Sequence, residues 1–336
     1  MKIEKLSQAT DKEEFIKNFA ALNLSLNQDY NRPASSPASV VHLLNVFKDV
    51  PKELILIHDG ANYIGRVCAN LTKADEDYVL FGFLEYDRSK KEILKLLMSE
   101  VEAYTKSNNR NKIMGPIDIN VWFGNRFKMQ GFDDNRSWEP NSPKEYLEHI
   151  QTLDYQLDQD YLSCFYTSLM PCYERTKTAY DKVVSEGYTF RTIDITKNGE
   201  IDKLYAMNIG GFSQNYFYEP ISREQYEMTH ILALKDFDFQ YSYFILDQNG
   251  KELGYVFSYP DHDKRIIIKS LVMDPNARGA RLSSALVHMS IKQAKENGII
   301  LACGACVRKG NISEHFFDHL GDKERVHEYT LVSKSL

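Results

Sequence analysis

The order of apolar and polar positions repeats once along the chain. In the first half, helix-like spacing over residues 10–22 and 37–47 is followed by strand-like runs and then by a long amphipathic stretch at about residues 89–105. The strand-like runs cover residues 53–58, 61–71 and 78–85, and Asp59-Gly60 supplies a hairpin turn between the first two.

The second half follows the same order. After a strand at residues 189–195, the pattern predicts helices at 200–212 and 223–234, a hairpin at 241–246 and 252–258, a third strand at 265–273 and a long helix at 283–297. A strand at 299–307, a helix at 313–320 and a strand at 327–332 close the chain. An element order that recurs in this way predicts a duplicated fold.

A helix predicted at residues 171–186 connects the two halves. The expected division is a first domain at residues 1–170 and a second at residues 187–336, with no low-complexity linker between them. Both domains are expected to belong to the α/β (α+β) class, because strands and helices occur in each.

Composition narrows the possible classes of protein. Of the 336 residues, 43% are hydrophobic and 26% are charged, as in an ordinary globular protein. The net charge of −6 lacks the basic excess of proteins that bind phosphate backbones, so no nucleic acid partner is expected. Five scattered cysteines suit reduced thiols, and no apolar run approaches the roughly 18 residues that span a bilayer. A cytoplasmic protein without a membrane partner is expected.

The segment at residues 265–299 carries the most specific chemistry. An apolar strand ends at Asp274-Pro275, a loop with Arg278 and Arg281 follows, and a helix opens with Ser283-Ser284. Free backbone N–H groups at a helix start, together with the helix dipole and two arginines, favour an anion. The spacing therefore predicts an anion site, for which a diphosphate is a natural occupant.

This segment resembles the acyl-CoA-dependent N-acetyltransferases of the GNAT superfamily. Residues 273–284 read M-D-P-N-A-R-G-A-R-L-S-S, where the family has V-x-P-x-x-R/Q-G-x-G-x-G/A between a strand and a helix. Asn311 and a short helix ending at Leu320-Gly321 follow in the family's order. The resemblance rests on motifs over residues 187–336 and on element order over residues 1–170. It implies tandem GNAT folds, each a mixed, mostly antiparallel sheet flanked by helices.

The resemblance also implies an activity, namely transfer of an acetyl or other acyl group from acyl-CoA to an amine of a small molecule or peptide by direct attack. In this family the backbone N–H at the position of Met273 stabilises the oxyanion. Glu219, in the loop that should overhang the acceptor side, or Ser270 acting through a water, is the expected base. No metal is expected. The residues expected to bind acetyl-CoA are Leu271, Met273, Arg278, Gly279, Ala280, Arg281, Leu282, Ser283, Ser284 and Asn311.

Some positions depart from the family pattern. Arg281 and Ser283 stand where the family usually has glycines. A left-handed backbone at a non-glycine residue costs about 1 to 2 kcal/mol, so weaker cofactor binding is expected if the loop needs such dihedral angles. Phe317 stands where many members have a tyrosine that protonates the leaving thiolate. The equivalent turn in the first half, residues 86–91, has no glycine, so that half is expected to lack a cofactor loop.

Two alternative functions stay open on the sequence. One is an acyltransferase whose donor is acyl carrier protein or aminoacyl-tRNA, although the acidic net charge disfavours tRNA. The other is a catalytically weak CoA-binding or ligand-binding regulatory protein, which the departures at Arg281, Ser283 and Phe317 favour.

The remaining motifs have ordinary structural explanations. Cys303 and Cys306 are three apart in a predicted strand, where side chains alternate, so their sulfurs are expected to diverge. His315 and His319 share a helical face, for which solvent exposure is the default. The aromatic cluster at residues 212–218 is expected to be either core or one wall of the acceptor site.

Overall fold

The computed structural model describes residues 1–26, 36–235, 237–277 and 280–336. The chain divides into two compact units. Unit 1 consists of Met1–Asp160, Tyr216–Glu219 and Glu328–Leu336, and unit 2 consists of Tyr161–Asn215 and Pro220–His327. This division differs from the one at residues 170 and 187 expected from the sequence. The strand at Gln156–Tyr166 begins in unit 1 and ends in unit 2, and the strand at Lys323–Ser335 begins in unit 2 and ends in unit 1. The loop segment Tyr216–Glu219 belongs to unit 1, although unit 2 residues flank it in the sequence.

Unit 1 contains a mixed sheet whose strands follow the order β1-β2-β3-β4-β5-β13. Neighbouring strands are antiparallel from β1 to β4, β4 and β5 are parallel, and β5 and β13 are antiparallel. Only residues from Glu328 onward of β13 belong to this unit, so the last strand of the chain completes the first sheet. The strands are β1 (Lys2–Lys5), β2 (Lys52–His58), β3 (Tyr63–Leu71), β4 (Tyr78–Tyr86), β5 (Lys112–Gly115), β6 (Phe127–Lys128), which pairs with β13, and β13 (Lys323–Ser335).

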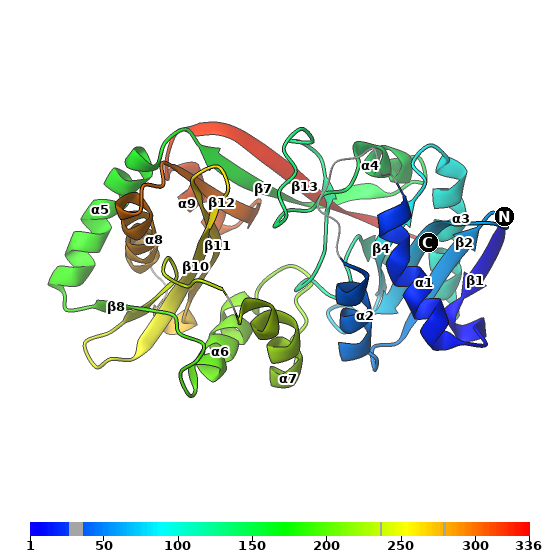
Figure 1. Ribbon diagram of the computed structural model, residues 1–336, viewed down its shortest axis with the longest axis horizontal. Coiled ribbons are helices and arrows are strands. Elements are labelled where there is room, and N and C mark those ends of the chain that lie inside the picture. Colours follow the sequence, from blue (N-terminus) through cyan, green and yellow to red (C-terminus); the bar gives the residue numbers. More distant parts are fainter. Residues whose placement is uncertain (27–35, 236, 278–279) are drawn as a thin grey trace. The chain divides into compact units, whose positions relative to one another are not determined.

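Helices cover both faces of this sheet (Figure 1). On one face, Ile93 and Leu97 of α3 and Tyr146 of α4 are buried in a hydrophobic core with residues of the sheet. On the other, Phe19 of α1 contacts Phe83, and the guanidinium of Arg66 donates to the carbonyl of Phe19. The helices are α1 (Lys12–Ser25), α2 (Pro37–Val46), α3 (Lys91–Ser107) and α4 (Lys144–Gln151), with a 3-10 turn, η1, at Leu6–Gln8.

Unit 2 has the strand order β7-β12-β11-β10-β9-β8. The parallel pair is β11 and β12, and the other neighbours are antiparallel. The strand next to β12 is the second part of β7, from Tyr161 on, so each unit contains a strand from the other half of the sequence. The strands are β7 (Gln156–Tyr166), β8 (Thr189–Thr192), β9 (Tyr243–Leu246), β10 (Glu252–Asp261), β11 (Arg265–Met273) and β12 (Leu301–Arg308).

The helices of unit 2 also lie on both faces of its sheet (Figure 1). The core on one face lies under α5 and α8, where Val183, Leu286 and Ile291 are buried with Ile266 and Ile268 of β11. On the other face, α6 packs against β11. The helical segments are α5 (Leu169–Ser185), α6 (Glu200–Phe212), α7 (Arg223–Tyr226), η2 (Glu227–Ile231, a π-helix), η3 (Leu232–Leu234), η4 (Pro275–Ala277), α8 (Ala280–Glu296) and α9 (Ile312–Asp318).

Most of the predicted elements are present, and the differences have local causes. The strand at 265–273 and the helix at 200–212 have the predicted bounds. The helix expected at 223–234 changes from α to π and then to 3-10 geometry. The connecting helix predicted at 171–186 is α5, and it is a core helix of unit 2 rather than a linker, because its apolar side packs on α8. Each unit is a mixed, mostly antiparallel sheet flanked by helices, which confirms the predicted fold class.

No helix in the described part of the chain is both long enough and apolar enough to cross a membrane.

Candidate functional site

Strands β11 and β12 separate partway along their length. Their parallel ladder joins Arg265–Ile268 to Leu301–Gly304 and, among the described residues, ends there. Strand β11 continues to Met273 along its other neighbour, β10, in which Gly254 lies opposite Met273. Beyond Ile268, the edge of β11 that faces away from β10 therefore has no paired strand among the described residues. We call the region beside this edge the opening.

The backbone of Met273 faces this opening. The N–H of Asp274 donates to the carbonyl of Leu253 in β10 at 2.7 Å. Because successive residues of an antiparallel strand direct their N–H and C=O groups to alternate sides, the N–H of Met273 points away from β10. The N–H of Leu271 has the same orientation, since the pairing register is regular between these residues. Met273 therefore has the orientation needed for an oxyanion donor, and Leu271 that needed for a backbone contact with a ligand.

Two glycines allow close packing around the end of β11. A Cβ atom added to Gly211, near the end of α6, would collide with a methyl group of Val272 and would lie 3.8 Å from the carbonyl oxygen of Met273. A Cβ added to Gly254 would lie 2.6 Å from the sulfur of Met273. The absence of side chains at these two positions lets α6 and β10 pack closely on the last residues of β11.

Helix α8, at whose start the sequence predicts an anion site, begins just beyond β11. The predicted residues Arg278 and Gly279 lie outside the described residues, and α8 starts at Ala280. In its first turn Arg281 is exposed, whereas Leu282, Ser283 and Ser284 are partly buried. The first N–H groups of a helix have no partner within it, so this turn can donate hydrogen bonds to an anion.

Arg281 already has a carboxylate partner. Its Nη1 lies 3.1 Å from Oε1 of Glu186, the C-cap residue of α5. A solvent-exposed ion pair of this kind contributes about 0 to 1 kcal/mol, so a phosphate can displace Glu186 at little energetic cost.

Three further predicted positions, Ser270, Asn311 and Phe317, also lie in unit 2. Ser270 is partly buried and pairs with Phe257 of β10. Asn311 is the N-cap of α9, and its side chain accepts a hydrogen bond from the N–H of Ser313 at 3.3 Å. Phe317 is buried and its ring packs so closely on Gly304 that no larger residue fits there. The hydroxyl of Tyr166 donates to the carbonyl oxygen of Phe317.

Glu219 lies in unit 1, whereas Ser270 and Met273 lie in unit 2. Its Oε2 accepts hydrogen bonds from the hydroxyl of Thr72 at 2.9 Å and from the N–H of Lys73 at 3.1 Å. The carboxylate of Glu219 therefore accepts two hydrogen bonds from residues of unit 1. The structure does not bring Glu219 together with Ser270 and Met273 within one unit.

Unit 1 repeats the geometry of the β11 opening. Strand β4 pairs in parallel with β5 from Tyr78 to Leu80 only. The N–H of Asp87 donates to the carbonyl of Ile64, and Gly65 lies opposite Tyr86, as Gly254 lies opposite Met273. Tyr86 is therefore the counterpart of Met273.

In unit 1, however, residues of the same unit fill this opening. The N–H of Ile117 donates to the carbonyl of Phe81 at 2.7 Å, and the N–H of Phe83 donates to Oδ1 of Asp118 at 2.5 Å. The hydroxyl of Tyr146 accepts from the N–H of Tyr86 at 3.0 Å. These contacts occupy the edge of β4 that corresponds to the part of β11 beyond its described pairing with β12.

The sequence motifs do not predict that residues of unit 1 fill this edge of β4. The only hint in the sequence is the shared order Tyr86-Asp87 and Met273-Asp274 at the ends of the two third strands. The residues that fill the edge lie 31 to 60 positions downstream of it, in a loop and a helix whose apolar patterns carry no sign of that role.

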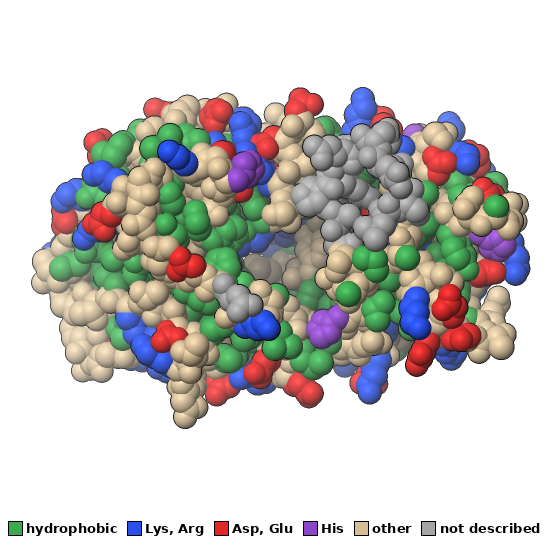
Figure 2. Space-filling model, in the orientation of Figure 1, with side chains coloured by type: hydrophobic (Ala, Val, Ile, Leu, Met, Phe, Trp, Pro, Cys, Tyr) green, Lys and Arg blue, Asp and Glu red, His purple; other side chains and the backbone are tan. Residues whose placement is uncertain are grey.

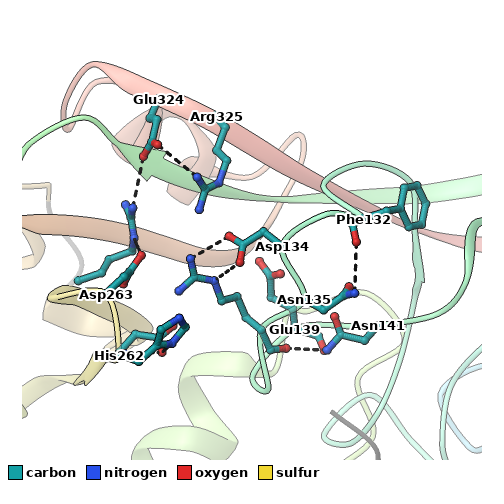
Figure 3. Close-up of polar contacts among 12 residues, drawn as sticks. Phe132, Asp134, Asn135, Glu139, Asn141, His262, Asp263, Glu324 and Arg325 are labelled. Atoms are coloured by element: carbon teal, nitrogen blue, oxygen red, sulfur yellow. Dashed lines mark hydrogen bonds and ion pairs between the residues drawn. The ribbon is translucent and has the colours of Figure 1, made fainter. Parts of the chain in front are cut away.

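The charged loop between β5 and α4 is a structural element of unit 1. Lys128 and Glu139 form a fully buried ion pair at 3.5 Å, and burial lowers the pKa of Lys128. Asp134 holds the guanidinium of Arg136 through two hydrogen bonds of 2.7 and 2.8 Å, and Figure 3 shows Asn135 and Asn141 bonded to neighbouring backbone carbonyls. These hydrogen bonds and ion pairs offset the free-energy cost of burying charged side chains in this loop.

A second polar group in Figure 3 belongs to unit 2. Glu324 lies between Arg325 and the buried guanidinium of Arg265, at 3.2 and 3.3 Å. Asp263 also contacts Arg265, at 3.2 Å. This cluster anchors the start of β11, at the opposite end of the strand from Met273.

The other motifs show no ligand-binding geometry. Cys303 and Cys306 form no disulfide, and β12 bulges between Gly304 and Val307, so simple strand alternation does not apply at Cys306. His315 and His319 are exposed, with ring centres 4.3 Å apart. The described residues contain no cluster of three or more His, Cys, Asp or Glu side chains suited to a metal ion.

Basic and acidic side chains are interspersed over the face of each unit that Figure 2 presents. That face therefore lacks the continuous basic surface that a large polyanion would need.

Comparisons with known proteins identify the fold. Residues 210–321 match the acetyltransferase (GNAT) family model, and no curated protein matches the chain significantly. A tandem GNAT protein from the clavulanic acid biosynthesis pathway superimposes with a TM-score of 0.57 at 10% identity, covering 99% of this chain and 98% of that one. A GCN5-related N-acetyltransferase from Sphaerobacter thermophilus gives a TM-score of 0.52 at 10% identity, covering 99% of this chain and 95% of that one. Another, from Kribbella flavida, gives a TM-score of 0.53 at 8% identity, covering 99% of this chain and 72% of that one.

The family match spans β10, β11 and β12, whose pairing defines the opening, and also α8 and α9. The structural matches extend over 99% of the chain. Residues 210–321 therefore form a domain of the acetyltransferase (GNAT) family, and the chain as a whole has the tandem GNAT fold.

Proposed function

We propose that unit 2 transfers an acetyl or other acyl group from acyl-CoA to an amine of a small molecule or peptide. The observation that carries the proposal is the unpaired edge of β11, where the N–H of Met273 points into the opening beyond Gly304. A thioester carbonyl held on this N–H gains a hydrogen bond that strengthens as its oxygen becomes negative. The first turn of α8 offers donors for the diphosphate of CoA, next to Arg278 and Arg281 in the sequence.

The attacking amine must lose a proton. An alkyl amine with a pKa of about 10.4 is mostly protonated at neutral pH, so the site must accept that proton as the carbon–nitrogen bond forms. In our proposal Ser270, partly buried on β11 beside Phe257, holds a water that accepts it. The departing CoA thiolate takes its proton from solvent, because Phe317 has no acidic hydrogen to give.

Unit 1 has no acyl-CoA site in this proposal. The edge of β4 that corresponds to the opening of unit 2 is filled by Ile117, Asp118 and Tyr146. The acyl-CoA site then belongs to the second half of the sequence, within residues 187–336, and the first half, residues 1–170, has another role.

Binding and turnover test the proposal. Acetyl-CoA affinity is measured by calorimetry on wild type, on Arg278→Ala and on Arg175→Ala, which removes an exposed guanidinium on α5. We expect Arg278→Ala to weaken binding about tenfold and Arg175→Ala to leave it unchanged. Thiol release is then followed with a panel of small amines and peptides. Failure of wild type to bind acetyl-CoA at millimolar concentration would exclude the proposal.

A second candidate function is a catalytically weak CoA-binding regulatory protein. It is favoured by Phe317, whose buried ring takes the place of the family's tyrosine, and by the ion pair that already engages Arg281. Acetyl-CoA binding without thiol release on any amine supports this candidate instead. An acyl carrier protein or aminoacyl-tRNA donor finds no support in the mixed charge of the described residues on the face that Figure 2 shows.

A further inference from the structure

Four aromatic side chains of unit 2 form one group of contacting rings. Phe237 and Phe239 lie shortly before β9 in the sequence, and Phe257 and Tyr259 lie on β10. Their ring centres are between 5.1 Å apart, for Phe237 and Phe257, and 6.0 Å apart, for Phe239 and Phe257. All four residues are partly exposed, so the group presents aromatic surface to a ligand. We call these four residues the aromatic wall.

Hydrogen bonds join the two segments that carry the wall. The hydroxyl of Ser242 donates to the carbonyl of Ser258, which lies between Phe257 and Tyr259, at 2.9 Å. The same hydroxyl accepts from the N–H of Ser258 at 3.0 Å, and the N–H of Ser242 donates to the carbonyl of Phe239 at 2.8 Å. Both serines are fully buried, so water does not compete for these bonds. The wall is therefore held in place without a ligand.

The wall lies on the face of the sheet that α6 covers. Val256 is buried in the core under α5 and α8, and side chains alternate along a strand, so Phe257 points to the other face. Tyr255 points the same way as Phe257, and its hydroxyl donates to Oδ1 of Asn208 in α6 at 2.6 Å. Helix α8, whose first turn is the proposed diphosphate site, packs on the opposite face. Acyl-CoA bound at α8 therefore leaves the face with the wall to the acceptor.

The wall also lies near the strand edge proposed to hold the thioester. Phe257 is directly opposite Ser270 of β11, and side chains opposite each other in an antiparallel pair point to the same face. Ser270 precedes Met273 by three residues, which is roughly 10 Å along a strand. An amine whose nitrogen lies at the Met273 edge can therefore reach the wall with one ring on a short alkyl chain.

From this placement we infer that the aromatic wall binds the acceptor, and that the acceptor is a primary amine with an aryl group on a short alkyl chain. The inference rests on the proposed acyltransferase function of unit 2. An aryl group makes edge-to-face and offset contacts with the wall that an alkyl group of equal area does not make. Phe237 and Phe257 are therefore specificity-determining residues. The wall is separate from residues 212–218, which the sequence suggested as one wall of the acceptor site.

A pair of amine probes tests the inference without any turnover. Phenethylamine and cyclohexylethylamine carry rings of the same size on the same alkyl chain, but only the first ring is aromatic. The affinity of each is measured by calorimetry on the full chain in the absence of acetyl-CoA. The ratio of the two affinities is then compared between variants, because this comparison cancels the difference in hydrophobicity between the probes. Putrescine, a diamine without a ring, is the cationic control.

Four variants complete the binding experiment. Phe257→Leu and Phe237→Leu each remove one ring of the wall, and we expect each to lower the preference for phenethylamine about fivefold. Tyr259→Phe keeps the ring and should keep the preference. Phe190→Leu is the matched control, because Phe190 is a partly buried ring that packs on the core under α5 and α8. An unchanged preference in both Phe257→Leu and Phe237→Leu overturns the inference, as does tighter binding of putrescine than of phenethylamine by wild type.

Kinetics supply the second measurement. With acetyl-CoA as donor, Phe257→Leu should raise KM for phenethylamine about fivefold, while acetyl-CoA affinity stays within about twofold of wild type. Phe190→Leu should leave both values unchanged. An unchanged KM in Phe257→Leu overturns the inference. If wild type acetylates no amine, the proposed activity fails on its own account, and the binding experiment alone decides whether the wall holds an aryl amine.

Discussion

The hydroxyl of Tyr146 lies 3.0 Å from the backbone N–H of Tyr86, the N–H that corresponds to the proposed oxyanion donor of unit 2. The same hydroxyl lies 3.0 Å from the carboxylate of Glu85, and the rings of Tyr146 and Tyr86 stack with their centres 4.4 Å apart. A buried side chain thus takes the position that a thioester carbonyl would need. Both units share this strand geometry, and in unit 1 side chains of the same unit occupy it.

The filled edge of unit 1 predicts one acetyl-CoA per chain. Calorimetric titration should give a stoichiometry of one, because Ile117, Asp118 and Tyr146 occupy the second possible site. The Arg278→Ala variant should weaken this single binding event without uncovering another. Two equivalents of bound acetyl-CoA would contradict the assignment of the site to unit 2.

The adjacent glycines Gly210 and Gly211 should respond differently to alanine. A Cβ at Gly211 would collide with Val272, whereas a Cβ at Gly210 would have no atom within 4 Å. We expect Gly211→Ala to lower the thermal midpoint and to reduce thiol release at least about tenfold, because α6 must shift away from β11. Gly210→Ala should stabilise the helix by up to about 1 kcal/mol through its higher helix propensity. Equal activities in the two variants would contradict the close packing of α6 on β11.

Asp118 should make unit 1 less stable as pH rises. Burial raises the pKa of its carboxyl to about 7, and the Phe83 N–H and Arg66 only partly oppose this shift. A carboxyl with a raised pKa in the folded state favours folding when protonated, so this contribution is lost as pH rises from about 4 to about 7. The loss is at most about 4 kcal/mol.

The Asp118→Asn variant isolates this effect. Its side-chain carbonyl can still accept from Phe83, but it does not titrate. We expect the variant to unfold at higher temperature than wild type at pH 8 and to lose the advantage near pH 4, as measured by calorimetry. A pH-independent difference between the two proteins would show that Asp118 does not titrate as stated.

His288 should give unit 2 the opposite pH dependence. Its ring is buried between Tyr173 and Tyr180, at 4.6 and 4.7 Å, and Thr176 lies 2.9 Å from its Nδ1. Burial lowers the pKa of His288 to about 4. A histidine with a lowered folded-state pKa is held neutral, so stability falls as pH drops from about 6.5 to about 4, by at most about 3 kcal/mol.

Replacement of His288 by phenylalanine should reduce the loss of stability that occurs as the pH falls below about 6.5. The ring stacking is retained, and the hydroxyl of Thr176 keeps its hydrogen bond to the carbonyl of Cys172 at 2.8 Å. The comparison is chemical denaturation at pH 7 and pH 4.5, with His262→Phe, at an exposed histidine, as the control. An equal loss of stability in wild type and His288→Phe would contradict the prediction.

The amino-acid sequence determined the local elements and the position of the cofactor motif. A run of apolar residues located β11, and helical periodicity located α6 and α8, because these signals depend on neighbours within a few residues along the chain. The motif at residues 273–284 indicated the family, since its residue types are tied to one strand, one loop and one helix start.

Only the tertiary structure decided which segments share a unit. The last residues of β13 complete the sheet of unit 1, and the segment Tyr216–Glu219 packs there as well, although both follow unit 2 elements in the sequence. Likewise, the contact of Tyr146 with Tyr86 joins residues 60 positions apart. Such pairings depend on the packing of strands and loops from distant parts of the chain, and single-residue patterns carry no record of a partner that far away.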